Sequence, residues 1–186
     1  MTDETRPYRK KRRAELEELT RLRITESAVA EHAGVPRSTL YRHFPDELAL
    51  FQACSAHWNV ANPPPDPGEW ARVADPEERL ARALEELYAY YRRTEAMLAN
   101  LLRDEATVPA VRQPFGAYYR YLDAIHDVLL RGRRVRGAAR RRVSAAIGHA
   151  LAFPTWRSLA REQGLDDRGA AALMRRLVAC AGVHAA

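Results

Sequence analysis

The strongest constraint on the fold is a run of apolar and aromatic side chains at helical spacing in the second half of the chain. The intervals between successive members are four, three, four, three and four residues, for Val111, Phe115, Tyr118, Leu122, Ile125 and Leu129. Such intervals place side chains on one face of an α-helix. The run begins just after Pro109, a residue tolerated in a first helical turn. The sequence therefore predicts a helix of about five turns with one buried face.

Helices are predicted for the rest of the chain as well. No segment shows the strict alternation, rich in Val, Ile, Thr and aromatic residues, that strands require. Proline, glycine and capping residues divide the helical patterns into about nine helices, which makes the fold class all-α. The predicted ranges are 11–22, 25–33, 37–43, 47–58, 76–91, 94–105, 109–129, 138–161 with a kink at Pro154, and 166–183.

A proline-rich stretch at residues 62–68, Asn-Pro-Pro-Pro-Asp-Pro-Gly, predicts the domain boundary. Proline lacks the backbone donor and fixes φ, so this stretch is expected to be neither helix nor central strand. Two domains follow from this boundary, over residues 1–60 and 61–186. The length of 186 residues suits such a pair.

Composition bounds the class of protein. Apolar residues make up 47% of the chain and charged residues 29%, which is enough to bury a core without resembling a membrane protein. The N-terminus lacks the apolar core of a secretion signal, so a cytoplasmic location without membrane contact is expected. The two cysteines, Cys54 and Cys180, are too few and too far apart for a disulfide framework or zinc knuckle. They are expected to be buried free thiols, and neither metal nor cofactor is predicted.

The most specific local pattern spans residues 30–45, AEHAGVPRSTLYRHFP. Two helices joined by a tight turn at Gly34 match the helix-turn-helix plan, in which the second helix enters the major groove of DNA. Val35, Leu40 and Phe44 form the apolar side of that second helix. The remaining side chains are donors suited to phosphate oxygens and base edges, and they are expected to face solvent: Arg37, Ser38, Thr39, Tyr41, Arg42 and His43.

This sequence closely resembles the DNA-binding signature of the tetracycline-repressor (TetR) family over about 35 residues. The resemblance implies a three-helix DNA-binding domain that binds a double-stranded DNA operator. It also implies contacts to the DNA backbone from Thr25, Thr39, Tyr41 and His43. Arg37 and Ser38 occupy positions where base-reading residues usually lie, and Arg37 is the best candidate for a guanine contact.

The chain departs from the family pattern in ways that bear on DNA affinity. Pro36 stands where a capping serine is usual, and Glu47 replaces a lysine that commonly meets phosphate. The segment at residues 20–24 also lacks the usual glycine-aromatic pair. Six basic residues between positions 6 and 13, among them Arg9, Lys10 and Lys11, either supply the missing attraction to DNA or form a disordered solubilising tail.

The second domain is expected to bind a small organic effector and a second copy of the chain. In the family the last two long helices pair with their twofold mates, here at residues 138–161 and 166–183. The aromatic, adaptable and imidazole side chains predicted to surround an effector are Tyr88, Tyr91, Met97, Phe115, Tyr118, Tyr119, His126, His149 and Trp156. Most of them equally suit ordinary core packing.

The predicted function is a ligand-responsive transcriptional regulator, most simply a repressor released from its operator by the effector. One alternative is a helical-bundle enzyme, because Asp123 and His126 have the spacing found in di-iron bundles; no second such pair occurs in the sequence. Another is a non-specific nucleic-acid binder. All but two of the 30 basic residues are arginines, and seven of these lie between residues 131 and 142, where a solvated face is the ordinary interpretation.

Overall fold

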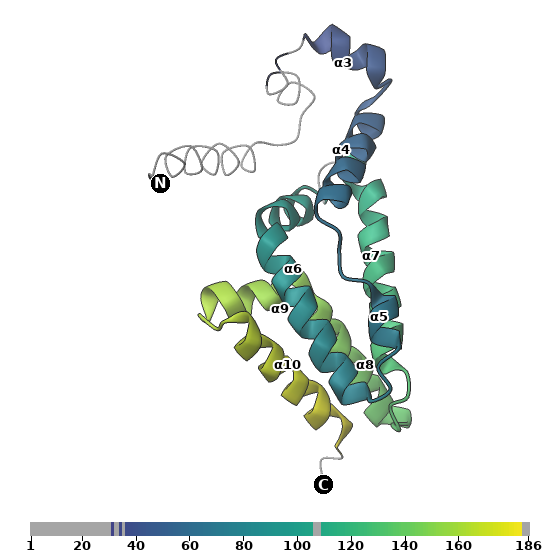
Figure 1. Cartoon of the computed structure of the whole chain (residues 1–186), viewed down its shortest axis with the longest axis vertical. Coiled ribbons are helices and arrows are strands. Elements are labelled where there is room, and N and C mark those ends of the chain that lie inside the picture. The colour runs from purple at the N-terminus through teal and green to yellow at the C-terminus, as the bar shows by residue number, and fades with distance from the viewer. Residues whose placement is uncertain (1–30, 32–33, 35, 106–108, 184–186) are drawn as a thin grey trace, which may run out of the picture. The chain divides into compact units, whose positions relative to one another are not determined.

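The computed structural model describes residues 31, 34, 36–105 and 109–183, and the secondary structure within them is entirely helical (Figure 1). This confirms the all-α prediction for the described part of the chain.

Two compact units are present, one formed by residues 1–62 with 95–116 and the other by residues 63–94 with 117–186. The predicted domain boundary near residue 60 remains a prediction. The helices are α3 (Arg37–His43), α4 (Glu47–Ala61), α5 (Pro67–Ala71), α6 (Pro76–Asp104), α7 (Pro109–Leu130), α8 (Gly137–Leu151), α9 (Phe153–Arg157) and α10 (Asp167–Gly182).

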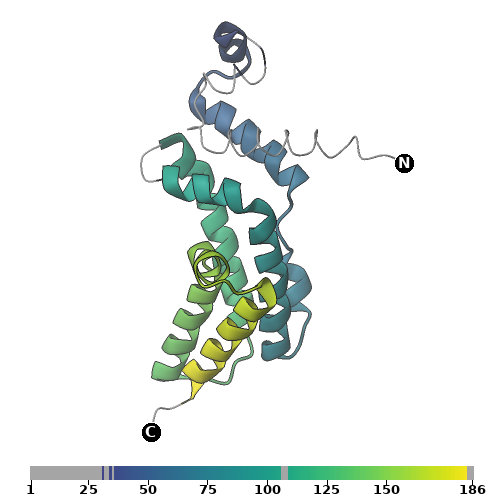
Figure 2. The same cartoon turned by 90° about the vertical axis from the view of Figure 1, so that its left-hand side faces the viewer.

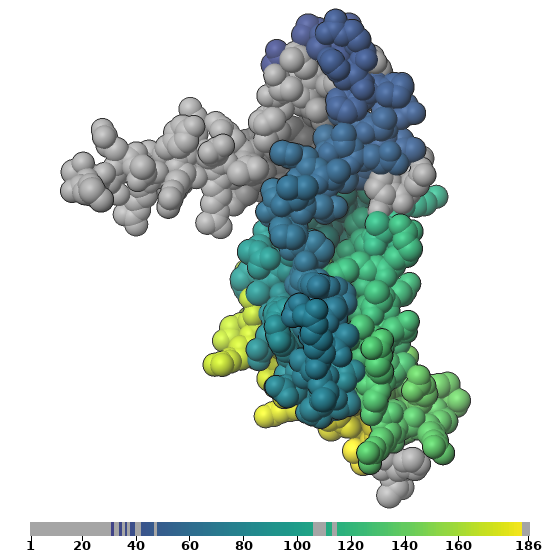
Figure 3. Space-filling model, turned by 45° about the vertical axis from the view of Figure 1, so that its right-hand side comes forward, coloured from purple at the N-terminus to yellow at the C-terminus, as the bar shows by residue number. Residues whose placement is uncertain are grey.

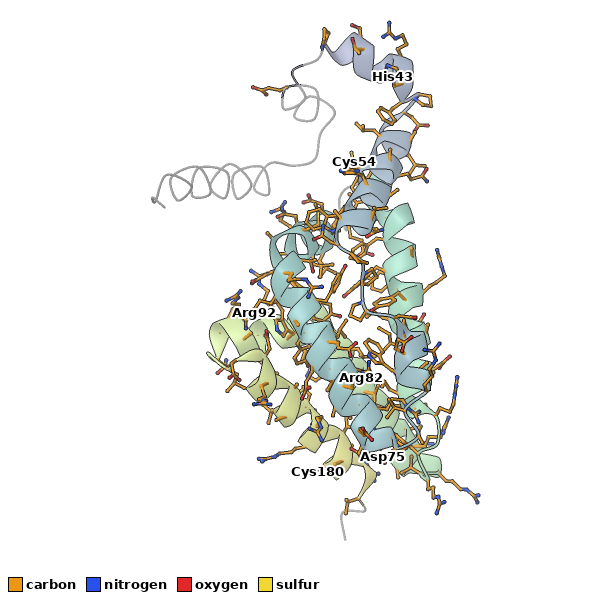
Figure 4. The ribbon with its side chains drawn as sticks, viewed as in Figure 1. His43, Cys54, Asp75, Arg82, Arg92 and Cys180 are labelled. Carbon is orange, nitrogen blue, oxygen red and sulfur yellow. The ribbon has the colours of Figure 1, made fainter. Side chains whose placement is uncertain are left out.

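Aspartate caps set the starts of three helices where the sequence predicts them. Asp46 Oδ1 accepts a hydrogen bond from the N–H of Ala49 at 2.7 Å and begins α4. Asp75, labelled in Figure 4, accepts from the N–H of Glu78 at 3.0 Å in the first turn of α6. Asp166 Oδ1 accepts from the N–H at residue 169 at 2.7 Å and begins α10. Each carboxylate satisfies a donor that the first turn would otherwise leave free.

The proline-rich stretch ends earlier than predicted. Helix α5 begins at Pro67, inside the segment that was expected to hold no helix. Proline is well placed in a first turn, where its missing N–H has no partner to lose, and Asp66 caps the turn by accepting from the N–H of Gly68. Trp70 is fully buried, and its Nε1 donates to Glu86 Oε2 at 2.9 Å. The prediction for residues 67 and 68 was therefore wrong.

One long helix replaces two predicted ones, and the number of helices in the described part of the chain differs from the predicted total of about nine. Helix α6 continues through Thr94, where the sequence suggested a new start. The buried Thr94 hydroxyl donates to the carbonyl of Tyr90, four residues earlier, at 2.8 Å. This back-bonding lets threonine lie inside a helix instead of capping one.

Helix α7 confirms the predicted helix from Pro109, and four members of its stripe are buried: Val111, Phe115, Ile125 and Leu129. The end of α7 is held by the buried side chain of Arg79. Its guanidinium donates to the carbonyls of Val128 and Arg131 at 2.8 and 2.9 Å, and to those of Val73 and Ala74. A cation at the carbonyl end of a helix is favourable because it complements the helix dipole.

The kink predicted at Pro154 is a complete break between α8 and α9. Proline has no N–H to offer the carbonyl of Ala150, and the N–H of Thr155 bonds to Ala152 instead. A π-helical turn, Ser158–Glu162, follows α9 and was not predicted. Gly164, at φ +74°, then ends this run as the sequence indicates, and α10 packs along α8 (Figure 2).

The sequence composition led to expectations about membrane-spanning helices and about the burial of the two cysteines. Among the described residues no helix is both long and apolar enough to cross a membrane. Cys54 on α4 and Cys180 on α10, both labelled in Figure 4, are exposed. The expectation that they are buried was wrong, because each lies on the outer face of a helix whose opposite face is in the core.

Candidate nucleic-acid interface

The turn before α3 depends on a glycine. Gly34 has φ +65°, and its N–H donates to the carbonyl of Glu31 at 3.1 Å. An added Cβ would meet nothing within 4 Å. The requirement for glycine is therefore conformational, since the left-handed region is costly for other residues. A positive φ is what the predicted turn requires; of the helix expected before it at residues 25–33, only residue 31 is among the described residues, and the helix predicted at residues 11–22 lies outside them.

Helix α3 starts directly after Pro36. The carbonyl of Pro36 accepts from the N–H of Thr39 at 2.9 Å, which closes the first turn although the usual capping serine is missing. No acidic residue lies in this turn, and Arg42 and His43 lie in the last one. Basic side chains at a helix C-terminus complement the dipole, so these two stabilise a helix only seven residues long.

Polar donors occupy the surface of α3. Ser38, Arg42 and His43 are exposed and Thr39 is half-buried; Figure 4 labels His43 at the end of the helix. Ser38 and Arg42 are four residues apart and share one face. Arg37 and Tyr41 also lie within α3, one turn apart along the backbone. The other predicted DNA contacts lie outside the described residues: Thr25, Arg9, Lys10 and Lys11.

The next helix, α4, has a buried apolar side of its own. Leu50 and Phe51 on α4 are buried, and Phe44, between the two helices, is half-buried. The outer face of α4 is exposed (Figure 3). Glu47 begins α4, so the departure from the family pattern places an acidic residue at the start of this helix. A carboxylate there favours the helix through the dipole but repels nearby phosphate.

Comparison with known protein families identifies this region. Residues 23–54, which include the Gly34 turn, α3 and the first half of α4, match the sequence model of the family described as bacterial regulatory proteins, tetR family. Over these residues the chain is similar to tetR-family regulators. The resemblance in the sequence is thus confirmed, together with an N-terminal helix-turn-helix domain and a role as a DNA-binding transcriptional regulator. No curated protein and no solved structure matched the chain.

In the second unit, four of the side chains predicted to meet an effector come together. The ring of Tyr91 lies 6.0 Å from that of Trp156 and 6.3 Å from that of Tyr88, and its hydroxyl is 3.3 Å from that of Tyr118. Phe153 completes this aromatic cluster, edge-on to Tyr91 at 5.4 Å. Sequence analysis missed Phe153, although an aromatic residue directly before the breaking Pro154 was a usable signal.

The buried tyrosines of the aromatic cluster already have partners. Tyr88 Oη donates to the carbonyl of Ala150 at 2.8 Å, and Tyr91 Oη donates to that of Leu151 at 2.6 Å. These are the carbonyls at the break before Pro154, so the hydroxyls replace the missing backbone donors. Burial raises the pKa of both tyrosines well above 10, and it raises the pKa of Tyr118 to about 12.

The other predicted effector contacts lie elsewhere. Tyr119 is 43% exposed, and its ring lies 5.7 Å from that of Tyr118. His126 Nε2 is 3.0 Å from both the carbonyl and the hydroxyl oxygen of Ser144. His149 is exposed, and its Nδ1 lies 3.3 Å from the Thr155 hydroxyl. Two further residues, Met97 and Phe115, belong to the first unit.

One charged group adjoins the aromatic cluster. Asp167 at the start of α10 accepts two hydrogen bonds from Arg92, at 2.6 and 2.8 Å, and one from Trp156 Nε1 at 2.9 Å. Figure 4 labels Arg92 on α6. Desolvation by itself would raise the pKa of Asp167, but the bonds from Arg92 and Trp156 outweigh it and lower that pKa. The ionised carboxylate therefore fixes Trp156 in place.

The residues considered for an enzyme do not assemble a centre in the described part of the chain. Asp123 is exposed, and His126, three residues later, bonds to Ser144. No group of three or more potential metal ligands occurs among the described residues. The tetR-family match favours a regulator over an enzyme.

Proposed function

We propose that this tetR-family regulator is a dimeric repressor that leaves its operator when a small organic molecule binds the second domain. The observation that carries the proposal is the surface of α3. Ser38, Arg42 and His43 are exposed on a short helix that follows the Gly34 turn, inside the segment that matches the family. An exposed helix of donors in this context suits entry into the major groove. Such a regulator would act in the cytoplasm, where bacterial DNA lies.

Within this proposal, base recognition falls to Arg37 and Ser38 at the start of α3. Arginine reads guanine through two parallel hydrogen bonds to O6 and N7. Thr25, Thr39, Tyr41 and His43 would hold the DNA backbone, with Arg42 adding charge. The basic arm that contains Arg9, Lys10 and Lys11 would compensate for Glu47.

Dimerisation is assigned to α8 and α10, which pack against each other and have exposed apolar or small side chains. On α10, Leu173 is 44% and Leu177 is 42% exposed. On α8, Ala145 and Gly148 are exposed and small enough to allow close approach of another helix. A twofold pairing of these surfaces would bury the leucines and present two α3 helices to one operator.

The effector is assigned to the aromatic cluster. Tyr88, Tyr91 and Trp156 are buried there, and the Tyr91–Tyr118 hydroxyl pair at 3.3 Å is longer than the bonds that these three side chains donate to Ala150, Leu151 and Asp167. A flat organic molecule with one polar group would replace that pair. Binding shifts the equilibrium between two arrangements only by the difference in its affinity for them, and release from the operator requires preference for the non-binding arrangement.

The experiment is a mobility-shift titration with DNA from the neighbourhood of the protein's own gene. The full chain is compared with Arg37→Ala and Tyr41→Phe, in the presence and absence of excess competitor DNA. We expect Arg37→Ala to weaken binding to specific DNA by about ten- to a hundredfold, in line with loss of one bidentate base contact, and to change non-specific binding little.

Tyr41→Phe serves as the matched comparison, because loss of one backbone contact weakens binding to all sequences alike. If Arg37→Ala also reduces binding equally on every sequence, Arg37 is a phosphate contact and base reading lies elsewhere. If competitor DNA removes all binding by the unaltered chain, the alternative of a non-specific, arginine-driven binder is correct.

A further inference from the structure

A groove lies in the second unit, apart from the aromatic cluster. Its volume is about 380 Å³, within the usual range for small-molecule sites. The walls come from the start of α6, the turn between α7 and α8, and one side each of α8 and α10. Apolar side chains form the floor: Val135, Val143, Val178 and Ala179. The groove is therefore a preformed apolar surface bounded by backbone and charged residues.

The rim of the groove is rigid. Arg133 donates to Glu77 and, at 3.0 Å each, to the carbonyls of Pro76 and Leu129. This fixes the turn between α7 and α8 against the start of α6, and the charge of Arg133 is neutralised by Glu77. Gly132, at φ +78°, allows the turn. A ligand would meet a rim that does not need to be ordered on binding.

The charge next to the groove is strongly positive and unpaired. Five arginines in and after the turn are exposed and make no ion pair or side-chain hydrogen bond within the described residues: Arg131, Arg134, Arg136, Arg140 and Arg141. No acidic residue lies in the first turn of α8. Arg134 is the member of this set that lines the groove. The turn between α7 and α8, in light green, lies at the surface in Figure 3.

We propose that this groove binds an amphipathic organic anion, such as a carboxylate with a short hydrocarbon body. The head would pair with Arg134 in the field of the neighbouring arginines, and the body would cover the valines of the floor. Neither part is sufficient alone: an exposed arginine holds a bare anion weakly, and the apolar floor does not distinguish charge. The site is additional to the aromatic cluster and does not depend on the proposed DNA contacts.

The test is calorimetric titration of the full chain with decanoate at sub-millimolar concentration and pH 7.5. Decanol, which has the same hydrocarbon body without the charge, is the ligand control. We expect decanoate to bind at least tenfold more tightly than decanol. Octanoate should bind about tenfold or more weakly than decanoate, because each buried methylene contributes about fourfold in affinity.

Variants locate the binding. Arg134→Gln removes the charge in the groove, and Ala179→Leu fills the floor from an exposed helical position. Each variant is expected to lower the affinity for decanoate at least tenfold. Arg141→Gln removes the same charge outside the groove and should change affinity by less than about threefold. Far-ultraviolet circular dichroism and a thermal melt check that each variant is folded.

Three results would overturn the proposal. Decanoate could fail to bind. Arg134→Gln and Arg141→Gln could weaken decanoate binding equally, which would show a diffuse charge effect. Alternatively, binding that survives both Arg134→Gln and Ala179→Leu but is lost with Tyr118→Ala would place the anion in the aromatic cluster. None of these results depends on whether α3 reads DNA, so the groove and the proposed function fail separately.

Discussion

Helices α3 and α9 are both short, and both have a proline at or next to their first residue. They differ in whether their side chains are buried or face solvent. In α9, Phe153, Thr155 and Trp156 are buried, and the break before the helix is repaired by tyrosine hydroxyls from α6. In α3, the side chains of Ser38 and Arg42 face solvent. One short helix is part of the core, and the other presents polar donors.

This difference separates stability from binding. Burial of apolar side chains is the main stabilising contribution, and α9 supplies it. The exposed donors of α3 add little to stability, so their value lies in what they contact outside the chain. Substitutions in α9 should therefore mainly change the free energy of unfolding. Substitutions in α3 should mainly change DNA affinity.

The largest effect is expected for Trp156→Ala. The side chain is fully buried, and its loss removes ring contacts with Tyr91 and the bond to Asp167. We expect the free energy of unfolding to fall by about 3–5 kcal/mol in a urea titration. Leu177→Ala, at a 42% exposed position on α10, is the control and should cost far less in the monomer. A loss below about 1 kcal/mol for Trp156→Ala would show that α9 is not core.

Tyr91→Phe is expected to have the next largest effect. It keeps the ring but leaves the buried carbonyl of Leu151 without its donor, which should cost about 1–3 kcal/mol of unfolding free energy. Tyr119→Phe removes a hydroxyl from an exposed ring, where water can bond to any group left behind, and should cost less than Tyr91→Phe. Equal stability of the two variants would contradict the assignment of the tyrosine hydroxyls as substitutes for the donors missing at Pro154.

On the α3 side, Arg42→Gln should change DNA binding and should reduce stability only slightly, by the loss of its favourable interaction with the helix dipole. If Arg42 meets one phosphate, the slope of log K against log salt should become shallower by about 0.9. The free energy of unfolding should stay within about 0.5 kcal/mol of the unaltered chain. Arg141→Gln, also exposed and unpaired in the described residues, is the control and should leave the salt slope unchanged. A similar decrease for both variants would favour the non-specific alternative.

The smallest effect concerns pH and Asp167. The pKa of Asp167 is lower in the folded chain than the ordinary 3.8. The ionised carboxylate therefore stabilises the folded state at pH values above 3.8. The contribution is lost as the pH falls below about 4 and through the lowered pKa. We expect the difference in unfolding free energy between the unaltered chain and Asp167→Asn to shrink over this range. Curves for the unaltered chain and Asp167→Asn that stay parallel over this range would refute the role of Arg92 and Trp156.

Local chemistry explains what could be predicted. The starts of α4, α6 and α10 follow from aspartates that accept bonds from nearby N–H groups, and the turn before α3 follows from Gly34. These features depend on residues within about four positions of each other, so they are visible in the sequence. The tetR-family match at residues 23–54 confirms the interpretation of the motif.

Features set by distant contacts could not be predicted. Thr94 looks like a helix start until its hydroxyl is seen to bond back to Tyr90. Tyr88, Tyr91 and Trp156 lie together, but the partners of the two tyrosine hydroxyls are carbonyls some sixty residues away in sequence. Helical spacing shows which side chains point inward and does not show which backbone groups they will meet.

The most direct test of the central claim is selection of binding sites by the full chain from a random double-stranded DNA library. The account predicts one enriched motif with twofold symmetry, whose half-sites are one helical turn or more apart, and loss of preference at one base pair in each half with Arg37→Ala. A library that shows no enriched sequence, while the protein still binds DNA at low salt, would contradict the claim that α3 reads an operator.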